Sequence, residues 1–254
     1  MNLHAIAFLV APLTFVSGLA GLRYQSWQPA AELAAETRDF INHTTGLVAT
    51  LSALALGLLI VDANSFYNSQ KASLELLAAR AVQLDEVLHL YGPEAQPARD
   101  QLKEMISRGY KQIWQSGDST SNVPTIEGSK ASMGAMFGFF NGLRPTASET
   151  QKYLLSRADD LISSIADQRM LMSLQLSTPL SSPLLAILVS WTSLMFFGFG
   201  MLARVNFATV IVMAAGAFSV ASAIFLIVEL NSPYDGILRL SPAPVLMAIS
   251  ALAN

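Results

Sequence analysis

The chain has 254 residues, of which 52% are hydrophobic and only 13% are charged, and its mean hydropathy is +0.45. A soluble domain usually carries about 25% charged residues, so this composition predicts an integral membrane protein. The net charge of −3 excludes the basic surface of a nucleic-acid-binding protein, and the lack of cysteine excludes disulfides, thiolate metal sites and a cysteine nucleophile.

Four stretches without charged residues are long enough to cross a bilayer, which takes about 20 apolar residues. They are residues 5–22, 44–61, 178–203 and 205–228. The first is short and contains Pro12, and its alternative interpretation is a signal peptide with a cleavage region at residues 17–20. Because Met1–His4 lacks the cationic start of a signal peptide, we expect the segment to be retained as the first of four transmembrane helices.

The four spans form two hairpins, and the residues between them read as a helical domain outside the bilayer. Residues 68–177 hold 11 of the 15 lysines and arginines and 12 of the 18 acidic residues. The sequence thus predicts an all-α membrane protein divided into hairpin 1 (1–67), a helical extramembrane domain (68–177), hairpin 2 (178–230) and a C-terminal turn and tail (231–254). The short loops carry few charges for the positive-inside rule, which leaves the side of the helical domain open; we favour short loops in the cytoplasm.

Heptad spacing predicts three helices in this domain. The second span continues into an a/d seam that packs helices side by side, and Gly92–Pro93 stops it, so we expect one helix from about Thr45 to Tyr91. The seam residues are Leu74, Leu77, Ala81, Leu84, Leu88 and Tyr91. A second helix is expected over 96–115, followed by an exposed loop at 116–128, and a third helix starts at Thr146 or Ser148.

The second span is the candidate lining of a pore. Ala49, Ala53 and Gly57 follow a small-xxx-small pattern, and Asp62 and Asn64 follow at its end. One interpretation is close helix packing through small residues. The other is a pore-lining helix with a polar mouth, because each such residue becomes a ring in a symmetric oligomer and charged rings set ion selectivity.

The fourth span runs into a polar C-terminal motif. Its members are Glu229, Asn231, Pro233, Tyr234, Asp235 and Gly236, followed by Ser241 and Pro242. Glu229 either pairs locally, with Arg204 or Arg239, or coordinates an ion as a buried carboxylate. The Asp-Gly pair predicts a tight turn at Pro233–Gly236, and Pro244 predicts the start of a short helix. The calcium-loop spacing of an EF-hand is absent and His4, His43 and His89 are far apart, so no metal site is expected.

Taken together, these segments resemble the bestrophin-like membrane family, a bacterial domain of unknown function. The resemblance covers nearly the whole chain and is carried by the two-hairpin layout, by the exit of span 2 at Gly57–Asn68, and by the turn at Leu90–Arg99. The most specific match is Glu229–Gly236 followed by Ser241–Pro244, where the family usually shows Leu-Asp-Arg-Pro-Phe-x-Gly and then Ser-Pro-x-Pro. Asn231 replaces a common Asp and Tyr234 replaces Phe, so one charge of the motif is missing here.

The resemblance implies a distant link to bestrophins, which are oligomeric anion channels. We therefore expect a homo-oligomeric ion channel in a bacterial inner membrane, with the lipid bilayer, further copies of the chain and inorganic ions as partners, and no nucleic acid. The alternative is a membrane scaffold or sensor whose helical domain binds a partner or ligand. No nucleophile–base pair, phosphate loop or metal triad is found, so neither enzymatic activity nor a cofactor is expected.

Overall fold

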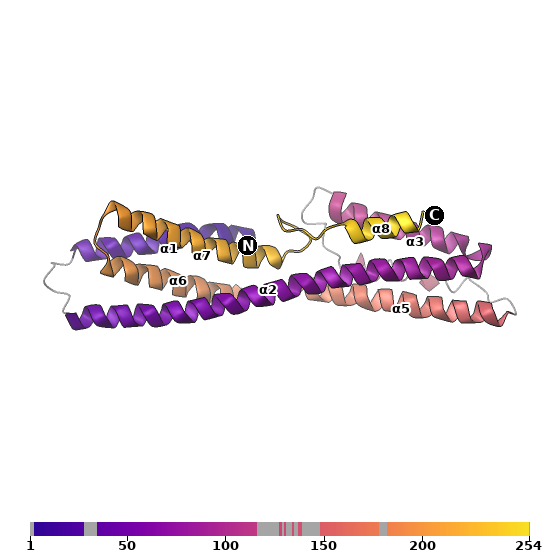
Figure 1. Cartoon of the computed structure of the whole chain (residues 1–254), viewed down its shortest axis with the longest axis horizontal. Helices are drawn as coiled ribbons and strands as arrows, with labels where there is room; N and C mark the ends of the chain where they lie inside the picture. Colours follow the sequence, from indigo (N-terminus) through magenta and orange to yellow (C-terminus); the bar gives the residue numbers. More distant parts are fainter. Residues whose placement is uncertain are drawn as a thin grey trace. The chain divides into compact units, whose positions relative to one another are not determined.

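The structure, a computed structural model, describes residues 3–27, 35–115, 148–177 and 182–253, with a few positions between 127 and 138. Side chains are described from Leu9 onward. These residues are helical and include no β-strand (Figure 1), which confirms the predicted all-α class. The loop predicted at 116–128 lies largely outside the described residues. The helices belong to two compact units: Met1–Phe66 with Leu180–Asn231, and Tyr67–Pro179 with Ser232–Asn254.

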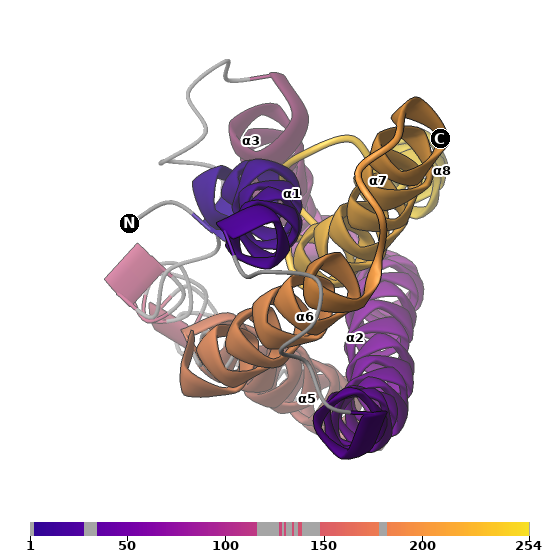
Figure 2. The ribbon, with the colours of Figure 1, turned by 90° about the vertical axis from the view of Figure 1, so that its left-hand side faces the viewer.

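The first unit, called here the apolar unit, contains four helical segments. They are α1 (Leu3–Trp27), the first part of α2 (Ala35–Tyr91), α6 (Ser182–Leu202) and α7 (Phe207–Leu230). Figure 2 shows α1 nearly end-on with α6 and α7 running obliquely, and α1 packs against both of the others. Asn206 caps α7 because its side-chain oxygen accepts a hydrogen bond from the Thr209 N–H at 2.7 Å, which explains the abrupt turn between α6 and α7.

Glycines allow α1 and α6 to approach closely. A Cβ atom on Gly21 would clash with the Phe197 carbonyl oxygen and meet the Gly200 Cα at 3.0 Å. A Cβ on Gly200 would in turn clash with the Gly18 carbonyl oxygen. The obstructing atoms are backbone atoms, which cannot move aside like the tip of a side chain. These positions therefore require glycine, as in the close crossings of transmembrane helices.

Three helices of the described residues are long and apolar enough to cross a membrane. They are α2, α6 (from Pro183) and α7. The first predicted span lies within α1, a 25-residue helix with Pro12 inside it. Four transmembrane spans therefore remain a prediction, of which three are supported by helix length and composition.

The second unit, called here the helical unit, contains the a/d seam that was predicted for the second half of α2. It contains the rest of α2, η1 (Pro93–Ala95), α3 (Gln96–Tyr110), η2 (Lys111–Gln115), α5 (Glu149–Ser177) and α8 (Ala243–Ala251). The seam residues of α2 are buried, except Leu77, which is partly buried and packs on the same core. The opposing residues Ala158, Leu161 and Ile165 of α5 are buried as well. The continuous helix expected to end at Tyr91 is present and begins ten residues earlier than Thr45, at Ala35.

The predicted helix at 96–115 is present but changes its geometry before it ends. Its last five residues, Lys111–Gln115, adopt π-helical geometry. Such segments often occur where a helix meets a functional or strained feature. Here the segment carries Ile113 and Trp114, which contact the C-terminal tail.

Candidate functional site

The exposed side of α2 in the apolar unit carries a row of small and polar residues. Residues seven apart lie on the same side of an α-helix, since seven residues make about two turns. Gly57 and Asn64 have this spacing, and both are exposed. The exposed small and polar residues on this side are Asp39, His43, Gly46, Thr50, Ala53, Gly57 and Asn64. Between Gly57 and Asn64 the row is interrupted by Ile60, which is partly buried, and by Val61, which is exposed. Apart from the adjacent residues and the backbone of α2 itself, no described atom lies within 4 Å of a Cβ built on Gly46 or Gly57.

Asp62 is exposed too, but it does not share this row. It is two residues from Asn64, which places the two side chains on nearly opposite sides of the helix. Asp62 instead follows Leu58 by one turn and ends a second exposed row, formed by Leu47, Leu51, Leu54 and Leu58. The structure thus brings Gly57 and Asn64 together and separates both from Asp62.

The apolar part of α2 is the least covered of the candidate spans. Of the residues in its most apolar stretch, 11% are buried, against 33% in α6 and 28% in α7. Its buried contacts come from the opposite side, where Ala55, Leu56 and Leu59 pack on the core of the apolar unit. One side of α2 therefore packs on the core of the apolar unit, and the other side is exposed.

The C-terminal motif makes the expected turn, one residue earlier than predicted. The Asp235 N–H donates to the Ser232 carbonyl at 3.1 Å, which defines a turn over Ser232–Asp235. Gly236 follows with φ of 83°, a left-handed conformation that favours glycine, and its N–H donates to the Asp235 carboxylate at 2.9 Å. The Leu240 N–H then donates to the Pro233 carbonyl at 2.8 Å, which closes the loop.

Three side chains tie this loop to the helices of the helical unit. Arg239 bridges the loop, since it donates to the Tyr234 carbonyl at 3.2 Å and to the Ile113 carbonyl at 3.0 Å. The indole N–H of Trp114 donates to the Leu240 carbonyl at 3.0 Å. The Tyr234 hydroxyl lies 3.5 Å from the Gln70 side-chain oxygen, and Gln70 also donates to Gln175 at 2.7 Å. We call these three side chains, together with the groups of Gln70, Ile113 and Leu240 that they contact, the tail clasp.

The remaining residues of the motif lie at helix ends. Glu229 lies near the end of α7 with 2% of its surface exposed. The Asn231 amide donates to the Ile227 carbonyl at 2.9 Å, so this side chain is engaged in ending α7. The Ser241 hydroxyl accepts from the Ala243 N–H at 3.3 Å, and Pro242 precedes the first residue of α8. The short helix expected near Pro244 is therefore present.

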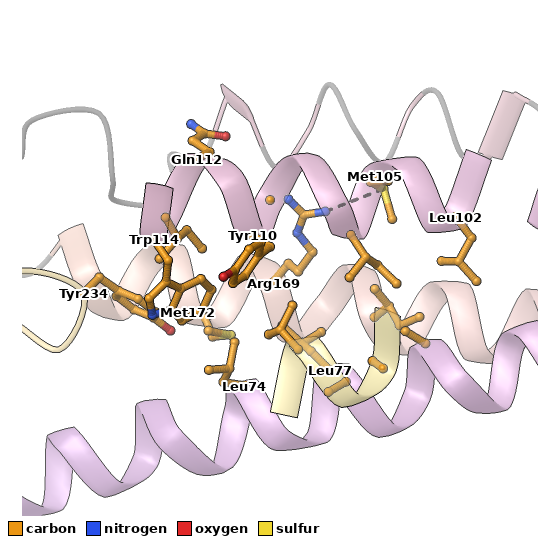
Figure 3. Close-up of a pocket in the computed structure, with 18 residues that line it drawn as sticks. Leu74, Leu77, Leu102, Met105, Tyr110, Gln112, Trp114, Arg169, Met172 and Tyr234 are labelled. Carbon is orange, nitrogen blue, oxygen red and sulfur yellow. Dashed lines mark hydrogen bonds between the residues drawn. The ribbon is translucent and has the colours of Figure 1, made fainter. Parts of the chain in front are cut away.

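A cavity in the helical unit adds a residue that sequence reasoning did not identify as a site. It has a volume of about 160 Å³ and is lined mainly by apolar and aromatic side chains (Figure 3). Arg169 of α5 borders it among these side chains. The signal was available in the spacing, because Arg169 lies four residues after Ile165 and three before Met172 and so falls on the apolar stripe of α5. Among the described residues, no group of three His, Asp or Glu side chains is placed to hold a metal ion.

These features define an all-α protein with apolar membrane-length helices and a separate helical unit. The family model described as a Bestrophin-like domain matches residues 10–245, and the chain belongs to this family. No match was found among curated proteins.

Solved structures share the fold across the whole chain. Two point variants of a bacterial bestrophin homolog from Klebsiella pneumoniae match with TM-scores of 0.68 and 0.69 at 14% and 13% identity. These matches cover 97% and 96% of this chain, and the same shares of the respective structures. A point variant described as a membrane protein matches with a TM-score of 0.64 at 13% identity, covering 97% of both chains. At this identity the likeness shows the fold, and with the apolar helices it places the chain among membrane proteins.

Proposed function

We propose that the chain forms a homo-oligomeric ion channel in which the small and polar row of α2 faces the central axis. The observation that carries this proposal is the exposure of that row, from Asp39 to Asn64, on the least covered span. Glycine and threonine leave room for an ion pathway between packed helices, and asparagine supplies polar atoms at its end. In a symmetric oligomer, the Asn64 side chains become a ring.

The leucine row of α2 supports an assembly through the same helix. Leu47, Leu51, Leu54 and Leu58 follow the 4-3-4 spacing with which parallel helices pack. In the proposed oligomer this row contacts lipid or the neighbouring copy. Asp62, at the end of that row, would lie off the axis and contribute charge near the mouth of the pore.

The membrane arrangement proposed here has four spans. Helix α1 serves as the first, supported by its length and by its packing on α6 and α7. The boundaries 1–67, 68–177, 178–230 and 231–254 separate hairpin 1, the extramembrane domain, hairpin 2 and the tail. The proposed location is a bacterial inner membrane, with both short loops in the cytoplasm.

Ion flux through reconstituted liposomes tests the channel. We expect Gly57→Leu to reduce flux severalfold, because each copy would place a leucine side chain on the axis, and Asn64→Leu to alter both flux and ion preference. Ser65→Leu is the matched control, since Ser65 is small and exposed but lies on the leucine side of α2. Well-folded protein that passes no ions contradicts the channel. A monomer or dimer by native mass spectrometry would favour a membrane scaffold or sensor instead.

For the C-terminal motif we propose a structural role first and an ion-binding role second. The support is the arrangement of Tyr234 and Arg239, whose polar groups bond to the protein itself. The buried carboxylate Glu229 separates the two roles, since Glu229→Gln keeps the shape and removes the charge. A structural carboxylate predicts a lower melting temperature with unchanged flux per folded protein. An ion site predicts unchanged melting and altered flux.

A further inference from the structure

The cavity of the helical unit is walled by apolar side chains from several helices. Leu74 and Leu77 of α2, Met105 of α3 and Met172 of α5 line it, and Val245 of α8 contributes from the tail. An engineered cavity of about 150 Å³ with aliphatic walls stays dry and binds benzene. The present volume of about 160 Å³ is therefore suited to an apolar group of similar size.

One positive charge, that of Arg169, borders this apolar space, and no described carboxylate pairs with it. Figure 3 shows the Arg169 guanidinium between Tyr110 and Met105 at the edge of the cavity. Its one hydrogen-bond contact in the described residues is to the Met105 sulfur, at 3.8 Å, and none of the described Asp and Glu side chains forms an ion pair with it. Burial lowers the pKa of Arg169 from its ordinary value, because desolvation disfavours the charged form.

Two other polar groups on the wall, the Trp114 indole and the Tyr234 hydroxyl, already have partners. The rings of Tyr110 and Trp114 stack at 5.8 Å, and Trp114 meets Tyr234 edge-on at 6.5 Å. The Trp114 indole N–H and the Tyr234 hydroxyl both point to partners in the tail clasp. Arg169 is thus the charged group of the cavity wall that can recognise a ligand. The aromatic side chains beside it favour contact with a flat or aliphatic part of that ligand.

We propose that this cavity binds a small carboxylate with an apolar body, whose carboxylate pairs with Arg169 and whose body fills the space between α2, α3 and α5. A guanidinium presents a planar set of N–H donors that matches a carboxylate in two parallel hydrogen bonds. A cationic ligand would lie beside the positive charge of Arg169, and the apolar walls would offer it no compensating group. A neutral molecule of equal size would fill the space but leave the partly buried charge unpaired, which is unfavourable.

A ligand series on the full-length protein tests this proposal directly. Isothermal titration calorimetry in lipid nanodiscs, with empty nanodiscs subtracted, would compare hexanoate and benzoate with hexanol, benzyl alcohol and hexylammonium. Hydrogen bonds to charged groups contribute about 1.5–3 kcal/mol, so the carboxylates should bind at least about tenfold more tightly than the alcohols. Hexylammonium should not bind. Equal affinity for hexanoate and hexanol, or no binding of either carboxylate, would overturn the proposal.

Variants then locate the site. Arg169→Met should reduce carboxylate affinity to that of the alcohols, and Arg169→Lys should retain part of it. Arg157→Met is the matched control, since Arg157 lies on the same helix, is exposed and should leave binding unchanged. Ala78→Phe keeps the arginine and fills the cavity, so it should abolish binding of all compounds even if the Arg169 variants fold poorly. Unchanged hexanoate binding in both Arg169→Met and Ala78→Phe would refute the site. None of these measurements depends on ion flux.

Discussion

Arg99 holds the carboxylate of Asp85 through two parallel hydrogen bonds, one from Nε at 2.7 Å and one from Nη2 at 2.8 Å. The pair joins α3 to α2, and only 17% of the Arg99 side chain and 10% of the Asp85 side chain are exposed. The hydrogen bond to Asp85 raises the pKa of Arg99 above its ordinary value. The pair also fixes the turn at Gly92, since it links the residues before and after it.

Removing one partner of this pair should destabilise the helical unit. Breaking a largely buried ion pair leaves a charge without compensation, so Asp85→Asn and Arg99→Met should each lower the free energy of unfolding by about 2 kcal/mol or more. The control is the pair Glu104–Arg108, whose side chains are 63% and 72% exposed. Arg108→Met should change stability by less than about 1 kcal/mol. Urea unfolding followed by circular dichroism checks this prediction, and equal effects in both pairs would contradict it.

Glycine is required at the crossing of α1 and α6. Gly21→Ala should lower the melting temperature in detergent, with a loss of about 1–3 kcal/mol, because the added methyl group meets the backbone at Phe197 and Gly200. Gly57→Ala has open space around it and should be neutral or slightly stabilising, since alanine favours the helix by about 1 kcal/mol. A thermal-shift assay on both variants measures the two melting temperatures. An unchanged melting temperature for Gly21→Ala would show that α1 and α6 can move apart without loss of stability.

The loop of the tail clasp depends on the left-handed residue Gly236. Gly236→Ala forces a side chain into a conformation with φ of 83°, and we expect a loss of about 1 kcal/mol together with faster proteolysis of the tail. Gly109→Ala is the control, because Gly109 lies in α3 with free space around it. Limited proteolysis followed by mass spectrometry would detect cleavage between residues 231 and 242. Equal cleavage rates in the two variants would mean that the loop tolerates a Cβ.

Burial of Tyr234 makes stability fall at alkaline pH. Desolvation raises the pKa of its hydroxyl well above the ordinary value of 10.0. The folded state therefore keeps a proton that the unfolded state loses, so the contribution is intact below pH 10 and declines as pH rises above it. For one proton the slope is about 1.4 kcal/mol per pH unit.

Tyr234→Phe removes the ionisable group and should flatten this slope between pH 10 and pH 11. Tyr153→Phe, at a 70% exposed position, should retain it. Chemical unfolding at pH 8, 10 and 11 gives the comparison. Parallel pH profiles for the wild type and Tyr234→Phe would place the origin of alkaline unfolding elsewhere.

Much of this fold could be predicted from the sequence, because helix faces and helix ends depend on the spacing of nearby residues. The seam from Leu74 to Tyr91 follows a heptad spacing, and all of its residues are buried except Leu77, which is partly buried. Gly92–Pro93 stops α2 where expected, because Gly92 has a φ of 121°, far from helical values, and Pro93 lacks the N–H that a continuing helix would use. The π-helical end at Lys111–Gln115 was not predicted, because its residues have ordinary helix propensity. This segment contacts the distant tail through Ile113 and Trp114, which spacing along the chain does not reveal.

The site residues were harder to place, since they depend on contacts between distant segments. Trp114 and Leu240 are 126 residues apart in the sequence and yet share a hydrogen bond. Arg169 falls on the apolar stripe of α5 by its spacing, but that it borders a cavity follows only from the packing of α2, α3, α5 and the tail. The separation of Asp62 from Asn64 follows from helix geometry alone, but which side of α2 is covered required the packing of the bundle.

The helical unit is assembled from two stretches of chain with the α6–α7 hairpin between them. Tyr234, Leu240 and Val245 complete one of its cores, and Leu252 contributes to another. During synthesis these cores cannot close when α5 leaves the ribosome, because the segment ending in α8 follows only after both hairpin helices. The helical unit can therefore complete its cores only after α6, α7 and the tail have been synthesised.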